Sequence, residues 1–294
     1  MLKRVREAAR ARLVRVVEEV TARHRKELEA VIRHERRELR RELTAVMRDQ
    51  ADRSAKRTID AVDEAVATVR RTDRKSRRDL RAVAQLDAAL DSARFAQDNM
   101  PTVPTFARPV DTLRHALDMA PTTGMALEFG VYSGETLQTI ARYRNGTGVY
   151  GFDSFKGLPE DWRSGFPAGT FGRDGLPEVE GAELVVGWFD ETLSGFLAEH
   201  PGEVDFLHLD ADLYSSTRTV LDLVGPRLRI GSIVVFDEYF NYPGWRGHEH
   251  RAWREYVERT GTTFSYEGYT RNSEQVIVRI TGRRPDGTDA TSAS

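Results

Sequence analysis

The stretch Met125-Ala-Leu-Glu-Phe-Gly-Val-Tyr-Ser-Gly-Glu-Thr-Leu137 decides the fold of the second half of the chain. Its apolar run ends in Glu128-Phe-Gly130, a short loop follows, and a predicted helix begins at Gly134. Twenty-five residues after Glu128, a second apolar run, Val149–Phe152, ends in Asp153. In such a β-loop-α-β unit the glycines let the backbone approach a ligand, and the acid at the next strand tip can bind ribose hydroxyls. The pattern predicts a nucleoside site in which Asp153 accepts two hydrogen bonds from vicinal hydroxyls.

The spacing of the glycines in this loop narrows the choice of ligand. Glu128-x-Gly130-x-x-x-Gly134 differs from the Gly-x-Gly-x-x-Gly pattern that cradles a pyrophosphate. It suits a nucleoside without a diphosphate, and S-adenosylmethionine fits that description. The alternative is an ordinary tight turn between a strand and a helix, but Asp153 and the acidic strand ends described below favour the ligand site.

Composition divides the 294 residues into two segments with different roles. Residues 1–98 carry a net charge of +8, whereas the remainder carries −10, and such asymmetry indicates separate functions. The absence of cysteine excludes a disulfide framework and a thiolate metal site. No apolar run approaches the roughly 20 residues of a membrane span, and the basic N-terminus lacks the apolar region of a secretory signal. We therefore expect a soluble, cytoplasmic protein.

The first hundred residues contain neither Gly nor Pro and are rich in Ala, Arg, Glu and Leu, which predicts helix. Apolar residues follow a heptad with polar interruptions over Ile59–Leu90, and a weaker seam covers Leu28–Val46. Residues 48–58 are poor in apolar side chains and mark a candidate break. Because so polar a helix needs a partner, we expect residues 1–98 to form a coiled coil that makes a homo-oligomer, with a helical hairpin as the alternative.

The basic excess of this segment admits a second interpretation. The run Arg70–Arg78 is the best candidate for binding an anionic partner. Acidic residues are interspersed throughout, however, and there is no aromatic wedge. We favour a solvated coiled-coil flank, do not expect nucleic acid to bind, and leave an anionic membrane surface open as the less favoured partner.

The remaining chain alternates predicted strands and helices. Residues 99–106 contain two prolines and predict a linker, residues 107–281 form the second domain, and the tail from Gly282 to Ser294 is expected to be disordered. A polypeptide that begins near residue 102 is expected to keep the fold. The alternation predicts an α/β, Rossmann-like doubly wound sheet of seven strands with ligands at their carboxyl ends. We expect strands near 125–130, 148–153, 183–187, 204–210 and 231–237, a closing hairpin at 262–266 and 275–280, and helices near 110–120, 134–143, 190–199, 214–224 and 247–259.

Carboxylates end two further predicted strands. Asp210 and Asp212 follow one, and Asp237 and Glu238 follow the next. Neighbouring strands lie about 4.8 Å apart, so these acids can converge on one hard cation, and oxygen-only ligands favour Mg²⁺, Ca²⁺ or Mn²⁺. The alternatives are solvated carboxylates, helix caps, or the Asp-x-Asp of a metal-dependent sugar-nucleotide transferase. The pattern upstream argues against the transferase.

Together these motifs resemble a known family over residues 105–281. The segment is similar to class I S-adenosylmethionine-dependent methyltransferases, and within that class to the macrocin O-methyltransferase family of metal-dependent sugar O-methyltransferases. The resemblance is carried by Glu128–Thr136, Gly151–Pro159, Gly187–Phe189, Asp210–Thr217 and Asp237–Tyr239.

The resemblance implies an activity and a set of site residues. The activity is methylation of a sugar hydroxyl on a natural product or surface glycan, with Mg²⁺ or another divalent cation at Asp210, Asp237 and Glu238. The resemblance implies an aspartate at the position where this chain has Glu238, whose side chain is longer. Glu128, Gly130 and Ser133 would line the methionine side of the cofactor, Asp153 would hold the ribose, Trp188 and Phe189 would lie by the adenine, and Gly134 and Ser154 complete the cofactor-binding set.

The general base is open among several residues. Asp210 is the first candidate and Asp212 the second, while His248 and His250 could assist, bind substrate, or simply be polar surface residues at a helix start. The Gly- and Pro-rich insertion 154–181, which carries Trp162, Phe166 and Phe171, is too long for an ordinary connection and predicts a lid, with a surface loop as the alternative. A competing function is a coiled-coil scaffold without activity, against which the intact acid set argues.

Overall fold

The computed structural model describes residues 2–76 and 78–283, and the chain forms two compact units, Met1–Arg78 and Asp79–Ser294. The boundary predicted at residue 98 is therefore displaced to the Arg78/Asp79 junction. The predicted tail has its first two residues in the last strand, and residues 284–294 lie outside the described part.

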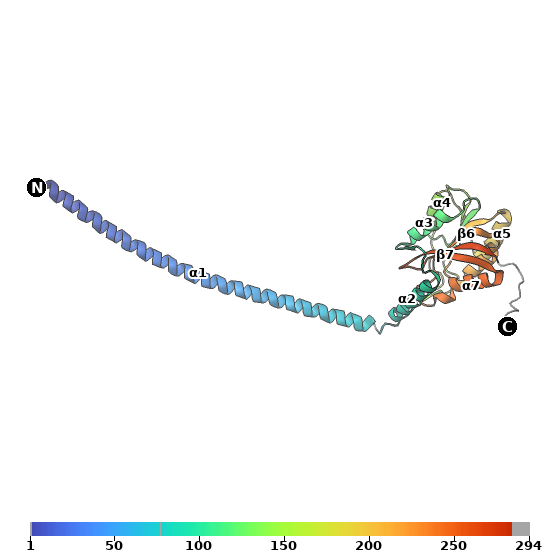
Figure 1. Cartoon of the computed structure of the whole chain (residues 1–294), viewed down its shortest axis with the longest axis horizontal. Coiled ribbons are helices and arrows are strands. Elements are labelled where there is room, and N and C mark those ends of the chain that lie inside the picture. The colour runs from blue at the N-terminus through green and yellow to red at the C-terminus, as the bar shows by residue number, and fades with distance from the viewer. Residues whose placement is uncertain (1, 77, 284–294) are drawn as a thin grey trace. The chain divides into compact units, whose positions relative to one another are not determined.

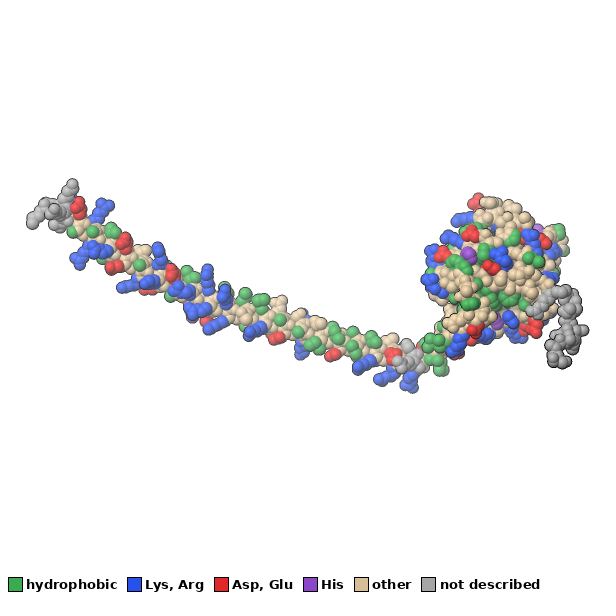
Figure 2. Space-filling view, in the orientation of Figure 1, with side chains coloured by type: hydrophobic (Ala, Val, Ile, Leu, Met, Phe, Trp, Pro, Cys, Tyr) green, Lys and Arg blue, Asp and Glu red, His purple; other side chains and the backbone are tan. Residues whose placement is uncertain are grey.

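The first unit consists of one helix, α1 (Leu2–Ser76), of 75 residues. It continues through residues 48–58, so the candidate break is not present. The apolar side chains of the predicted seams are exposed on this single chain; Ile59, for example, is 60% accessible. Figure 2 shows hydrophobic and basic side chains interspersed along its length. Pairing of these seams into a coiled coil stays a prediction. None of the described helices is sufficiently long and apolar to cross a membrane.

A second helix, α2 (Leu80–Asn99), belongs to the second unit. The Asp79 side chain caps its start by accepting the backbone N–H groups of Arg81 and Ala82 at 3.0 and 3.4 Å, which satisfies donors that a helix start leaves unpaired. Its small or aromatic face, made of Ala88, Ser92, Phe95 and Ala96, is buried. The chain thus has two helices where one continuous heptad was predicted, and a polypeptide that begins at 102 would lack part of this core.

The second unit is built on an eight-stranded sheet with the strand order β1-β7-β8-β6-β5-β2-β3-β4. Strands β2 to β6 run parallel, and β8 is antiparallel to both β6 and β7. All seven predicted strands are present, and the eighth is a two-residue edge strand inside the predicted linker. The strands are β1 (Thr105–Phe106), β2 (Met125–Phe129), β3 (Val149–Asp153), β4 (Glu183–Val186), β5 (Val204–Leu209), β6 (Leu228–Phe236), β7 (Thr262–Thr270) and β8 (Val276–Arg283).

Helices cover both faces of the sheet, and Figure 1 shows α3 and α4 on the opposite side from α7. One core packs α3 and α4 against residues such as Ala126 and Ile233. The larger core packs α2, α5, α6 and α7 against the other face, which includes Leu127 and Val234. The alternation of neighbouring strand residues between the two cores follows from the two-residue period of a strand. The remaining elements are α3 (Pro109–Met119), α4 (Glu135–Tyr143), α5 (Phe189–Glu199), α6 (Tyr214–Val224), η1 (Gly225–Arg227), η2 (Trp245–Gly247) and α7 (Glu249–Thr260).

The strand order reverses direction at β2, which lies between β3 and β5. Ligands of open α/β sheets bind at the carboxyl ends of strands beside such a switch point. Backbone hydrogen bonds connect the strand ends there: Gly130 N–H donates to Phe152 O, Asp210 N–H to Phe129 O, and Asp237 N–H to Leu209 O. The fold therefore brings the loops after β2, β3, β5 and β6 to one edge in fixed register.

Candidate active site

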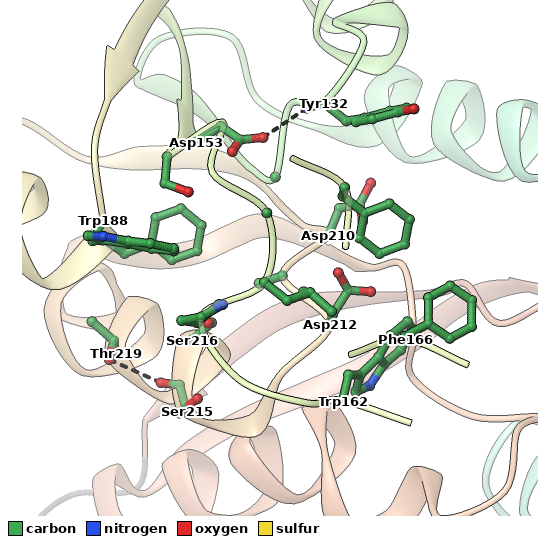
Figure 3. A pocket seen from close by; sticks show the side chains of 18 of the residues that line it. Tyr132, Asp153, Trp162, Phe166, Trp188, Asp210, Asp212, Ser215, Ser216 and Thr219 are labelled. Atoms are coloured by element: carbon green, nitrogen blue, oxygen red, sulfur yellow. Dashed lines mark hydrogen bonds between the residues drawn. The ribbon is translucent and has the colours of Figure 1, made fainter. Parts of the chain in front are cut away.

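A cavity of about 690 Å³ opens at the carboxyl ends of the strands. Its walls come from the loop after β2, the long insertion after β3, the start of α5, and the segment between β5 and α6. Figure 3 shows Asp210 and Asp212 between Trp188 on one side and Trp162 with Phe166 on the other. The cavity thus has room for a nucleoside and for a second molecule beside it.

Gly130 shapes the floor of the cavity. Its φ of +93° is accessible mainly to glycine, and a Cβ there would lie 1.8 Å from the carbonyl oxygen of Asp210. No side chain fits in that space. The backbone of the first loop therefore lies directly against the strand end that carries the acids.

Asp153 stands at the tip of β3 with its carboxylate oriented by backbone amides. Oδ2 accepts the N–H groups of Val131 and Tyr132, both at 2.9 Å, and Oδ1 accepts Phe155 N–H at 2.7 Å; Figure 3 draws the Tyr132 bond. A carboxylate has about four acceptor positions, so roughly one remains on Oδ1. Because Asp153 also lines the cavity, one ribose hydroxyl is a suitable donor, where the sequence had predicted two.

Three further predicted cofactor residues line the same end of the cavity. Trp188 precedes α5 and Phe189 begins it, so both rings are presented where β4 ends. Ser154 is buried beside Asp153, and its Oγ accepts Lys156 N–H at 3.1 Å. The aromatic wall and the small hydroxyl suit a flat heterocycle and a ribose.

The other three predicted cofactor residues are outside this lining. Glu128 is fully buried, and its Oε1 lies 2.9 Å from His208 Nδ1. Ser133 is exposed. Gly134 adopts φ +83° at the start of α4, where a Cβ would approach Val179 Cγ2 to 2.7 Å. None of these three residues lines the cavity.

The acids after β5 and β6 converge as predicted. One carboxylate oxygen from each of Asp210, Asp237 and Glu238 lies within 4.8 Å of the others, and Asp210 and Glu238 line the cavity. Glu238 Oε2 is buried and has no hydrogen-bond partner among the described residues. Three convergent oxygen donors with an unpaired buried oxygen fit a hard divalent cation.

His208, a residue that sequence reasoning missed, supports this cluster from behind. Its Nε2 lies 3.6 Å from Asp237 Oδ1 while Nδ1 faces Glu128. Burial opposes protonation of His208, but the two carboxylates hold its pKa well above the ordinary value. Burial likewise opposes ionisation of Asp237, yet His208 and the Gln275 amide, 3.1 Å from Oδ2, keep the Asp237 pKa below its usual range. Asp237 is therefore held as an anion.

The other two acids of the cluster, by contrast, resist ionisation. Burial, followed by the charge of Asp237, raises the pKa of both Asp210 and Glu238 well above the usual range. Two carboxylates that resist ionisation beside an anion need a neighbouring positive charge to ionise at neutral pH. A divalent cation would supply it.

Asp212 lines the same cavity as Asp210 and Glu238. It adopts φ +59° just before α6, and its side chain lines the cavity without a hydrogen bond to a described residue. Burial raises its pKa to about 7, although the nearby Arg163 opposes the shift. A free carboxylate with that pKa is suited to accept a proton near neutral pH.

The two histidines of the sequence prediction do not line the cavity. His248 lies beside Tyr242, and burial lowers its pKa. His250 packs among Phe95, Tyr239 and Trp245, with ring centroids 4.8–5.3 Å apart, and burial lowers its pKa to about 4. The role of His250 is packing between α2 and α7.

The insertion between Ser154 and Gly181 forms one wall of the cavity, as a lid would. Its Trp162, Phe166 and Phe171 line the cavity. Arg163 holds this wall in place: its guanidinium lies 3.9 Å from the Trp162 ring centroid and donates to both oxygens of Glu274 at 3.1 Å. Nothing in the sequence signalled the Arg163–Glu274 pair, because the two residues are far apart in the chain. His208 had one signal, a polar residue inside an apolar strand.

Comparison with known proteins agrees with this geometry. Residues 127–239 match the family described as a methyltransferase domain. This stretch of the chain is therefore similar to a methyltransferase domain. A relative of this domain is the 8-demethyl-8-(2,3-dimethoxy-α-L-rhamnosyl)-tetracenomycin-C 4'-O-methyltransferase of Streptomyces olivaceus, 28% identical over 159 residues. The alignment covers 44% of this chain and 59% of that relative.

Solved structures similar to this chain include two methyltransferases. A calicheamicin methyltransferase is 24% identical with a TM-score of 0.45, and the match covers 68% of this chain and 93% of that one. The O-methyltransferase NovP is 21% identical with a TM-score of 0.43, over 58% and 79% of the two chains.

Proposed function

We propose that this protein transfers the methyl group of S-adenosylmethionine to a sugar hydroxyl of a natural product or surface glycan, with a divalent cation bound beside the acceptor. The observation that carries the proposal is a cavity lined both by the residues of a nucleoside-binding end and by two acids of the buried cluster, with Asp212 in the same lining. The similarity to the Streptomyces relative, a rhamnosyl 4'-O-methyltransferase, supports a sugar acceptor.

The nucleoside end would hold the cofactor. Asp153 would accept a ribose hydroxyl, Trp188 and Phe189 would enclose the adenine, and the backbone at Gly130 would approach the methionine portion. Methyl transfer is an in-line displacement at the sulfonium carbon, so fixing the cofactor and the acceptor in one cavity supplies much of the catalysis.

The acid end would hold Mg²⁺ or another divalent cation on Asp210, Asp237 and Glu238. The buried, unpaired Oε2 of Glu238 and the raised pKa values of two of the three acids support this assignment. Such a cation would favour the ionised form of an acceptor hydroxyl and orient its oxygen. His208 and Gln275 would keep the Asp237 carboxylate turned to the site.

Asp212 would accept the hydroxyl proton. Sequence reasoning placed Asp210 first, but Asp210 belongs to the acid cluster, whereas the Asp212 carboxylate lines the cavity with no hydrogen bond to a described residue. A proton acceptor must reach the hydroxyl directly or through one water. The unpaired carboxylate of Asp212 meets that need better.

The insertion would exclude water and bind the acceptor. Trp162, Phe166 and Phe171 offer an apolar wall, and pockets for small molecules combine such walls with a few polar groups that orient the ligand. A scaffold without activity gives no reason for a cavity in which acids converge, so we favour the enzyme.

The test is consumption of S-adenosylmethionine in the presence of a glycan or glycoside extract, with and without EDTA. We expect turnover that requires a divalent cation and is lost in Asp210→Asn. Asp118→Asn, which changes an exposed carboxylate on α3, is the matched control and should retain activity. Turnover that survives EDTA, together with an active Asp210→Asn protein, would remove the metal from the mechanism. Failure of the wild-type protein to bind S-adenosylhomocysteine would overturn the proposed function as a whole.

A further inference from the structure

Helix α7 begins with a carboxylate in an unusual place. Glu249 is its first residue and is completely buried. Acids are common in the first turn of a helix because they interact with its dipole, but they ordinarily remain in water. A side chain of this kind inside the protein needs a specific partner.

Glu249 has one such partner. Its Oε2 accepts the backbone N–H of Glu238 at 3.0 Å, and its Oε1, also buried, has no hydrogen-bond partner among the described residues. Within the described part of the chain, Glu249 therefore forms no salt bridge and accepts no second hydrogen bond. The one hydrogen bond that it accepts comes from the peptide that joins Asp237 to Glu238.

That peptide sets the direction of two acids of the cluster. Tyr242 fixes the next peptide, between Glu238 and Tyr239, by donating its hydroxyl to Glu238 O at 3.2 Å. The oxygens of Asp210, Asp237 and Glu238 lie within 4.8 Å of one another, and like charges at such distances repel. A restraint on the backbone keeps the three side chains convergent as they ionise on cation binding.

We propose that Glu249 is a positioning residue of the cation site: through its hydrogen bond to Glu238 N–H it holds the Asp237–Glu238 peptide so that both carboxylates face one divalent ion. This role rests on the proposed function. It differs from a merely structural role, in which Glu249 would anchor α7 and its loss would lower stability without altering cation affinity.

The experiment measures Mn²⁺ binding to the full-length protein by the electron paramagnetic resonance signal of free Mn²⁺. Outer-shell partners of metal ligands typically change affinity about 10- to 100-fold, so Glu249→Ala should bind Mn²⁺ at least about tenfold more weakly. Glu249→Gln keeps an oxygen that can accept the amide and should bind within about threefold of wild type, since the hydrogen bond is retained. Glu258→Gln, at an exposed position of the same helix, is the control and should match wild type.

S-adenosylhomocysteine affinity in each variant reports whether the domain is folded. Wild-type Mn²⁺ affinity in a folded Glu249→Ala protein would overturn the role, as would a Glu249→Gln protein as weak as Glu249→Ala, because the charge alone would then matter. If Glu249→Ala fails to fold, Glu249→Asp decides, since its shorter side chain withdraws from the amide; unchanged Mn²⁺ affinity there also overturns the role.

Asp210→Asn separates this inference from the proposed function. If wild type binds Mn²⁺ and Asp210→Asn does not, the acid cluster is the cation site, and the Glu249 variants test the positioning role alone. If wild type and Asp210→Asn bind equally, the cluster is not the site, and the positioning role is overturned with it.

Discussion

Replacing Asp153 by Ala tests the cofactor end of the cavity. Backbone amides of Val131, Tyr132 and Phe155 already occupy three of the carboxylate's acceptor positions, so about one position is left for a ribose hydroxyl. A hydrogen bond to a charged group contributes about 1.5–3 kcal/mol. At 1.4 kcal/mol per factor of ten, S-adenosylhomocysteine affinity should fall about 10- to 150-fold.

Isothermal titration calorimetry with S-adenosylhomocysteine measures this change, and thermal unfolding without ligand reports how far the loss of three backbone contacts weakens the loop. Glu135→Ala is the matched control, because it removes an exposed carboxylate from the first turn of α4 without changing the cavity lining. Unchanged affinity in Asp153→Ala would refute the assignment. An equal loss in both variants would show that only long-range charge is involved.

Three further predictions concern the base, the core and the assembly. Because the pKa of Asp212 is about 7 and a base must be ionised, kcat should fall about tenfold per pH unit below that value; a flat profile between pH 5 and 7 would exclude Asp212. A polypeptide of residues 79–294 should unfold at the same temperature as the second unit of the full chain, whereas one of residues 102–294 lacks the buried Phe95 and should lose at least about 3–5 kcal/mol; equal melting temperatures would place α2 outside the core. Full-length protein should be a dimer or larger by light scattering and the 79–294 polypeptide should contain fewer chains; equal chain numbers would remove α1 from assembly.

Local patterns predicted the sheet and much of the site. Each of the strands β2 to β6 contains a short apolar run that ends at or just before a glycine or an acid, so its approximate position and the ligand-binding edge could both be predicted. Because parallel strands end at one edge, the convergence of Asp210, Asp237 and Glu238 followed from their positions after successive strands. The role of Gly130 could also be predicted, because a loop that approaches a ligand closely needs the backbone freedom of glycine.

Residues that act through partners distant in the chain could not be found in this way. His208 and Glu249 gain their roles from Asp237 and Glu238, and Arg163 gains its role from Glu274. His208 and Arg163 meet their partners only after strands and loops far apart in sequence have packed together. Glu249 is eleven residues from Glu238 and meets it through the fold of the segment between β6 and α7. Neither composition nor periodicity carries that information.

Helix α2 shows the same division between sequence and tertiary structure. The sequence by itself determined that residues 80–99 are helical, through good helix formers and a capping aspartate. Its larger apolar residues suggested a continuing seam, yet Leu80 and Leu90 remain exposed while Ala88 and Ala96 are buried with Phe95. Only the tertiary structure decided this, because the Phe95 ring packs against Trp245 of η2 and His250 of α7, and which face of a helix is buried depends on the shape of the opposing surface as well as on hydrophobicity.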